Sequence, residues 1–221
     1  MDFGLSFSFV FKDREWFRKI AIPALVSLIP VIGQFIVMGW GLKVTKNVIE
    51  GKLHNALPDL DFGADLGRGF LATVIGIIYG LPVAILTGIG GASFGFADSN
   101  ENMRVVLYIV GSCLGLLGLL LGILIAFMSV AAIANFVAKG RFGAAFNFKE
   151  IFALLKRSFG SWLLVIIGEI IALGIIAPLG LIVCAIGVLL TAVYGTAIYS
   201  HLIGQAYNKS TIPAQGQVET I

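Results

Sequence analysis

The sequence predicts an all-α integral membrane protein, and two observations support this fold class. Hydrophobic residues make up 58% of the 221-residue chain and charged residues only 12%, whereas a soluble domain has about 25% charged residues. The apolar residues also fall in blocks long enough to cross a bilayer, which takes about 20 residues of helix. We expect one membrane domain over 1–221, with about six transmembrane or hairpin helices in three helical hairpins and cytoplasmic amphipathic helices at the interface.

Residues 3–19 mix aromatic and charged side chains in FGLSFSFVFKDREWFRK. We expect an interfacial amphipathic helix, with aromatic rings at headgroup depth and basic groups facing lipid phosphates. The plainer interpretation is the solvated start of a helix. The expected interfacial anchors in this segment are Phe7, Phe11, Trp16 and Phe17.

The first apolar block, residues 20–42, contains prolines and has basic residues on both sides. A single span would place one basic group outside, against the positive-inside rule. A hairpin that turns near Pro30 keeps both groups in the cytoplasm, with one arm from about Arg14 and the other running to about Glu50. We favour the hairpin, and the single span stays open.

The middle of the chain reads as a second hairpin. Residues 51–69 are polar and predict a cytoplasmic loop and amphipathic lead-in, in which the acidic residues cap a helix start. A span over 70–92 follows, then an outside turn over 93–103. Residues 104–138 form a helix longer than one bilayer needs, which must tilt or protrude at one end.

The last apolar block, residues 162–203, is too long for one span. It breaks in the segment APLG, Ala177 to Gly180, because proline cannot continue a helix without a penalty and glycine permits a turn. The block thereby divides into helices of about 162–177 and 179–203. Before it, residues 139–161 are basic and aromatic, and Phe148 and Phe152 are further expected interfacial anchors.

This map places the N-terminus and the polar tail after Tyr207 in the cytoplasm. Of the 15 Lys and Arg residues, Arg104 is the one left outside, as the positive-inside rule requires. Aromatic, charged lead-ins before each hairpin suggest weak internal repeats over 1–50, 58–138 and 142–207.

Three segments carry a resemblance to a known family: IPALVSLIPVIGQFIVMGWGLKV, LPDLDFGADLGRGF with the span to IIYGLP, and HLIGQAY. They resemble a prokaryotic membrane family catalogued as domain of unknown function 4013, and the resemblance covers nearly the whole chain. It implies a bacterial or archaeal cytoplasmic-membrane protein and supplies no catalytic residues.

Polar groups inside predicted spans are the candidate functional residues, because burying them in a bilayer is costly. Glu169 is either a proton or cation site or a neutral or interfacial acid. Gln34 is expected to bond a neighbouring helix. His201 and Gln205 lie one turn apart near the cytoplasmic surface, where they form a site with the loops or are satisfied by water and headgroups.

Gly111, Gly115, Gly118 and Gly122 line one face of the long helix and predict a close helix contact, within the monomer or between subunits. Two histidines in all make a metal site unexpected, and no cofactor motif, phosphate loop or catalytic constellation is present. The net charge of +3 does not indicate nucleic-acid binding.

We therefore expect a non-enzymatic, self-associating membrane protein that acts as a scaffold, accessory subunit or membrane-shaping module. Its expected partners are membrane lipids and either further copies of itself or other membrane subunits. The alternative is a transporter or channel for a small or lipidic solute that uses Glu169.

Overall fold

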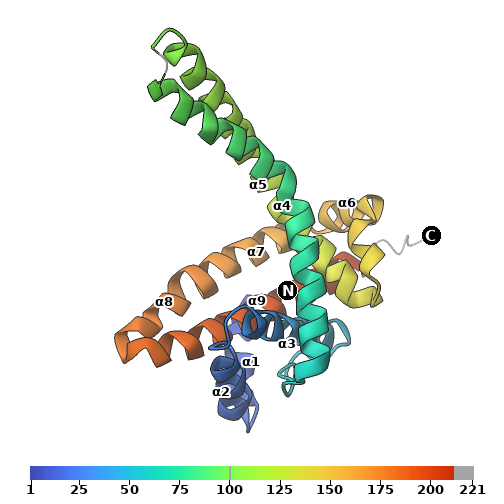
Figure 1. The fold of residues 1–221 in the computed structure, drawn as a ribbon. Coiled ribbons are helices and arrows are strands. Elements are labelled where there is room, and N and C mark those ends of the chain that lie inside the picture. The colour runs from blue at the N-terminus through green and yellow to red at the C-terminus, as the bar shows by residue number, and fades with distance from the viewer. Residues whose placement is uncertain (100, 212–221) are drawn as a thin grey trace, which may run out of the picture. The chain divides into compact units, whose positions relative to one another are not determined.

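The computed structural model describes residues 1–99 and 101–211, apart from the side chains of 183–186, and every secondary-structure element in that part is helical (Figure 1). The chain forms two compact units, Met1–Thr73 with Val130–Ile221 and Val74–Ser129. Four helical stretches are long and apolar enough to cross a membrane: Phe62–Ser99, Arg104–Lys139, Phe159–Ile182 and Gly187–Thr211. The prediction of an all-helical membrane protein is confirmed at this level.

The N-terminal segment forms two helices, α1 (Phe3–Lys12) and α2 (Trp16–Val26), so the single helix expected over 3–19 was wrong. The break has a local cause, because the Asp13 carboxylate accepts a hydrogen bond from the Glu15 N–H at 2.8 Å. Side chains of this kind compete with the helix for its backbone groups. One face of α1 is buried, and it packs on α9, the last helix (Cys184–Thr211).

Residues 20–42 do not form one helix. α2 ends at Val26 and α3 (Ile32–Ile49) begins after a turn, and the two helices pack on each other. At the tip the Ile32 N–H bonds the Pro30 carbonyl at 2.7 Å, and Val31 has φ +64°. This is a γ-turn of the rare, strained kind, unusual for a β-branched residue.

The middle hairpin consists of α4 (Phe62–Ser99) and α5 (Arg104–Lys139). The predicted lead-in and most of the predicted turn over 93–103 are part of α4, so those boundaries were wrong. Pro82 lies inside the helix without ending it, as is common in membrane helices, where neighbouring groups satisfy the freed carbonyl. The predicted end of α5 was right to within one residue.

The glycines of α5 pack against α4 of the same chain, within the unit Val74–Ser129. A Cβ at Gly111 would lie 3.0 Å from the Gly90 carbonyl oxygen, and one at Gly118 would lie 2.8 Å from Thr87 Cγ2. Gly115 has nothing within 4 Å. The close contact predicted for this face is therefore made within the chain.

After α5 the chain forms η1 (Phe142–Phe146), α6 (Phe148–Arg157), α7 (Phe159–Glu169), the π-helix η2 (Ile170–Ile176), α8 (Ala177–Leu179), η3 (Gly180–Val183) and α9. α7 and α9 are joined through α8 (Figure 1). The first helical stretch runs to Ile182 and the second begins at Gly187, so the turn falls a few residues after the predicted break at Ala177 to Gly180. Pro178 lies inside the first stretch, directly after the π-helix η2.

α3 and α9 run parallel through the core of the larger unit. The Thr45 hydroxyl donates to the Ser200 carbonyl at 2.9 Å, and Asn208 Nδ2 donates to the Val48 carbonyl at 2.8 Å. A Cβ at Gly204 would lie 2.6 Å from Val48 Cβ. Because the two parallel helices touch at successive turns, each residue of α3 can be matched to the residue of α9 that lies beside it. We call such neighbours level with each other.

Candidate functional site

The segment between α3 and α4, residues 51–61, has no regular secondary structure, yet side chains from three helices hold it in place. Buried backbone carbonyls outside helices need such partners. The donors and the carbonyls that accept from them are Lys19 Nζ with Leu57 (3.2 Å), Trp40 Nε1 with Pro58 (3.0 Å), Lys43 Nζ with Asp59 (2.6 Å), Asn47 Nδ2 with Ala56 (3.0 Å) and His201 Nε2 with Leu53 (2.9 Å). The segment is therefore fixed to α2, α3 and α9, and we call residues 51–61 the clamped segment.

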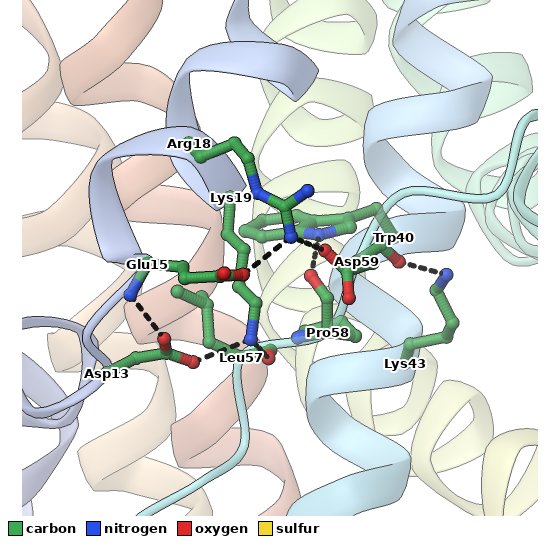
Figure 2. Close-up of polar contacts among 9 residues, drawn as sticks. All are labelled: Asp13, Glu15, Arg18, Lys19, Trp40, Lys43, Leu57, Pro58 and Asp59. Carbon is green, nitrogen blue, oxygen red and sulfur yellow. Dashed lines mark hydrogen bonds and ion pairs between the residues drawn. The ribbon is translucent and has the colours of Figure 1, made fainter.

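Charged side chains gather around this segment (Figure 2). We call the set the charged belt: Asp13, Glu15, Arg18, Lys19, Lys43 and Asp59. Arg18 pairs with Glu15 at 2.6 Å and with Asp59 at 2.8 Å, and these three side chains are all more than half exposed. Such exposed pairs are stable in water or among lipid headgroups and costly in hydrocarbon.

The best-sheltered pair of the belt joins Lys19 to Asp13 at 2.7 Å. Burial raises the pKa of the Asp13 carboxyl, but the Lys19 ammonium and the Glu15 N–H lower it by more, so the net pKa lies below its ordinary value. Asp13 is therefore ionised at neutral pH and closes the break between α1 and α2.

A buried carboxylate extends the belt to the start of α4. Asp65 is fully buried and pairs with Lys43 and Arg68, each at 2.9 Å, and it also accepts the Asp61 N–H at 2.7 Å. Asp61 caps the helix by accepting the Ala64 N–H at 3.2 Å. The predicted capping role of this acidic segment is therefore seen, together with ion pairs that the sequence did not reveal.

A polar cluster on the other side of the segment joins α1 to α9. His201 is fully buried and stacks on Phe9 with ring centroids 4.3 Å apart. Its Nε2 must carry the hydrogen, because it faces the Leu53 carbonyl, so its Nδ1 accepts from Ser6 Oγ at 2.9 Å. The Gln205 side chain bonds both backbone groups of Asp2, the N–H at 2.6 Å and the carbonyl at 2.9 Å.

A family model described as "Protein of unknown function (DUF4013)" matches residues 22–206. The chain belongs to this family. The DUF4013 match runs from α2 into α9 and so includes the clamped segment, while α1 lies before it. Neither the comparison with curated proteins nor the comparison with solved structures gave a match.

In this DUF4013 chain, His201 and Gln205 are satisfied by protein groups, with exposed fractions of 0% and 6%. The first of the two interpretations, a cluster formed with the loops, fits this geometry. Ser6 is the partner that sequence reasoning missed, since it lies 195 residues away from His201. The arrangement fixes α1 and the clamped segment in place. Among the described residues, no group of His, Cys, Asp and Glu could hold a metal ion.

Glu169 lies at the end of α7, where it is half-buried. No hydrogen bond or ion pair joins its side chain to another described residue. Its level follows from its neighbours: a Cβ at Gly168 would lie 2.1 Å from Leu202 Cδ1, and one at Gly195 would lie 2.6 Å from the Ala172 carbonyl oxygen. Glu169 on α7 is thus level with Tyr199 on α9. Tyr199 is in turn level with Lys43 of the belt on α3.

Gln34 does bond a neighbouring element, with Nε2 donating to the Ser27 carbonyl at 3.3 Å. It also lines a mostly apolar cavity of about 420 Å³ between α3, α9 and their neighbours in the larger unit. The polar members of the lining are Gln34, Thr73, Thr196, Tyr199 and Ser200. The cavity has room for a small amphipathic molecule.

The helix α6 places Phe148 and Phe152 on its outer face, each 50% exposed, while Ile151 lies fully buried. Glu150 pairs with Lys139 and accepts Asn135 Nδ2 at 3.0 Å, and these contacts lower the pKa of its carboxyl below the ordinary value. Phe148 and Phe152 are therefore accessible on the outer face of α6, and their role as interfacial anchors stays a prediction.

Among the predicted anchors of the N-terminal segment, Phe11 and Phe17 are 56% and 59% exposed, whereas Phe7 and Trp16 are half-buried. Phe11 contacts Trp16 and Tyr194, with ring centroids 5.1 and 5.5 Å apart. The aromatic side chains therefore surround the break between α1 and α2.

Proposed function

We propose that this chain is a non-enzymatic membrane-shaping or scaffolding module of a prokaryotic cytoplasmic membrane. In this proposal α4 and α5 cross the bilayer, while the α2–α3 hairpin and the α7–α9 hairpin enter it from the cytoplasmic side and turn back within it. The observation that carries the proposal is the distance from the level of the charged belt to the tip of each of the two shorter hairpins.

The depth of the α2–α3 hairpin follows from helix geometry. Lys43 lies twelve residues after the tip residue Val31, which is about 18 Å at 1.5 Å per residue. The hydrocarbon core is about 30 Å thick. A hairpin whose belt stays at the headgroups therefore ends well short of the far side.

The same limit applies to the α7–α9 hairpin because α3 and α9 are parallel and in contact. Tyr199, level with Lys43, lies fifteen residues after Cys184, the first residue of α9, or about 22 Å. A full crossing of Phe159–Ile182 and Gly187–Thr211 would draw the belt into the hydrocarbon. Each charge there costs about 2.5–3.5 kcal/mol by insertion scales, and the belt has six.

Two hairpins that turn back within the bilayer add more area to the leaflet they enter than to the other, as interfacial amphipathic helices do. The consequence is a preference for curved membrane. The α4 helix, by contrast, carries no charge between Arg68 and Asp98, a stretch of more than 40 Å, which is long enough to cross.

Cysteine labelling tests the topology. In a background where Cys113 and Cys184 are changed to Ala, single cysteines replace Ser99 at the end of α4, Leu28 at the α2–α3 tip and Ile182 before α9. A membrane-impermeant maleimide should label Ser99→Cys from outside only. Leu28→Cys and Ile182→Cys should react only after detergent is added. Outside labelling of Ile182→Cys would show a full crossing and refute the half-inserted hairpins.

Sorting tests the function. When the fluorescently labelled chain is reconstituted in giant vesicles, it should be enriched on membrane tubes pulled from those vesicles. Leu28→Glu puts a charge at the inserted tip and should abolish the enrichment. The matched control Met103→Glu adds the same charge between α4 and α5 and should leave sorting unchanged. Equal densities of wild-type protein on tube and vesicle would refute membrane shaping.

A second candidate function, transport of a small or lipidic solute, is favoured by the cavity of about 420 Å³ that Gln34 lines. Its discriminating variant is Glu169→Gln. Loss of solute flux in reconstituted vesicles, with assembly unchanged, would support transport. Self-association stays part of the proposal, and the particle mass in mild detergent tests it.

A further inference from the structure

An apolar groove lies directly beside the break between α1 and α2. Phe11, Trp16, Phe17 and Ile20 form one wall, and residues of α8 and α9, including Leu179 and Tyr194, form the other. The groove measures about 480 Å³ and is open to the outside, and nearly all of its lining is apolar. Filling it with water would cost free energy in proportion to its apolar area.

The far wall of the groove is tightly built. A Cβ at Gly180 would lie 2.3 Å from Thr191 Oγ1, so the two arms of the hairpin touch there. The Thr191 hydroxyl donates to the Ala177 carbonyl at 2.7 Å. The π-helix η2 directly precedes this contact, and short π segments often occur at functional sites. This wall is held by contacts between the two arms at backbone level, so movement of side chains alone does not close the groove.

The break beside the groove has an excess of positive charge. Lys12, Arg14, Arg18 and Lys19 surround it, against the two acids Asp13 and Glu15. Arg18 and Lys19 are paired with those acids. Arg14 is exposed and makes no hydrogen bond or ion pair with another described residue. It stands in sequence between Phe11 and Trp16, which both line the groove.

We propose that this groove binds one acyl chain of an anionic phospholipid, whose phosphate lies at Arg14. An apolar slot just on the hydrocarbon side of a basic break matches the two ends of such a lipid. The inference rests on the placement of the charged belt at the headgroups given under the proposed function. The bound lipid would fill the space between the two half-inserted hairpins and hold them at a fixed separation.

Tryptophan quenching in detergent tests the proposal without reference to membrane shape. Trp40 and Trp162 are fully buried, with exposed fractions of 0% and 1%, so bromine on an acyl chain should quench Trp16. Brominated phosphatidylglycerol should quench with a saturable curve. Brominated phosphatidylcholine should need about fivefold more lipid, the ratio expected for one basic residue near a lipid surface. Trp16→Phe should remove the signal.

Two matched pairs of variants locate the site. Arg14→Gln should remove the fivefold preference for phosphatidylglycerol, whereas Arg157→Gln, on exposed α6, should not. Leu179→Phe narrows the groove and should lower the maximal quenching. Leu181→Phe makes the same enlargement at a side chain that is 68% exposed and outside the lining, and should leave quenching unchanged.

Three results would overturn the inference: quenching that rises without saturation, equal binding of the two lipids, or equal effects of Leu179→Phe and Leu181→Phe. Saturable, selective quenching together with outside labelling of Ile182→Cys would refute the half-inserted topology and support the lipid site. If Leu28→Cys and Ile182→Cys are protected from labelling but quenching is unselective, the topology would be supported and the lipid site refuted.

Discussion

The glycine contact between α3 and α4 gives the sharpest quantitative prediction. A Cβ at Gly69 would lie 1.7 Å from the Phe35 carbonyl oxygen, and one at Gly39 would lie 1.8 Å from the Asp65 carbonyl oxygen. Both obstacles are helix backbone, which cannot rotate away as a side chain can. Gly69→Ala must therefore push the two helices apart.

The size of the effect follows from what that separation breaks. Overpacking costs about 1–3 kcal/mol, and separation also strains the pair between Lys43 and the fully buried Asp65, which is 2.9 Å long. We expect Gly69→Ala to lower the free energy of unfolding by at least about 3 kcal/mol. For a chain of this size that is a fall in Tm of roughly 6–12 °C.

The assay is thermal unfolding in mild detergent, followed by tryptophan fluorescence, to which Trp40 contributes; its Nε1 bonds the clamped segment. Gly67, two residues earlier on the same helix, has nothing within 4 Å of its Cβ position. Gly67→Ala should leave Tm unchanged or raise it, since Ala favours a helix by about 1 kcal/mol over Gly. If Gly69→Ala melts within about 2 °C of Gly67→Ala, the close α3–α4 contact is not present.

Three further predictions concern the belt, the tip and the buried histidine. The folded-state pKa of Asp13 lies below its ordinary value, so its contribution is fully present above about pH 4 and is lost as pH falls through the folded pKa; the Tm difference between wild type and Asp13→Asn should shrink below pH 4. Val31→Gly should raise stability by about 1 kcal/mol, because glycine adopts a positive φ without strain, and a lower Tm would show that the side chain matters more than the turn. His201→Ala should lower the free energy of unfolding by about 2–4 kcal/mol, because it leaves the Leu53 carbonyl unpaired and a cavity beside Phe9. It should also speed proteolysis between α3 and α4. Unchanged proteolysis would mean that the segment does not depend on this bond.

The sequence predicted those parts of the fold that depend on local composition. The length of an uncharged block fixed α5 to within one residue, and Pro30 lies in the turn between α2 and α3. Helix ends went wrong where a single side chain decides them, as Asp13 does between α1 and α2. At the end of α4, glycine and serine residues led us to predict a turn from residue 93, but the helix continues through them to Ser99.

The candidate site was largely hidden because its partners are far apart in sequence. Lys19 lies 38 residues before Leu57, and His201 lies 148 residues after Leu53. No spacing rule connects such pairs. His201 could be singled out as a polar group on an apolar helix, but Ser6 and Trp40 carry no such signal. The parallel contact of α3 with α9 is also invisible in hydropathy, and it is what sets the level of Glu169.

The level of Glu169 and Lys43 is one reason to propose membrane shaping in preference to transport. A path for a polar solute needs polar or ionisable groups spread through the depth of the membrane. Here residues 20–42, the part of the first hairpin between Lys19 and Lys43 of the charged belt, carry no ionisable group. Between Lys43 and the tip of the first hairpin, Gln34 is the one strongly polar side chain on α3, and it is committed to the Ser27 carbonyl. Apolar hairpins on one side of a charged belt are suited to an interface, and we therefore favour the proposal that the chain acts on the membrane itself.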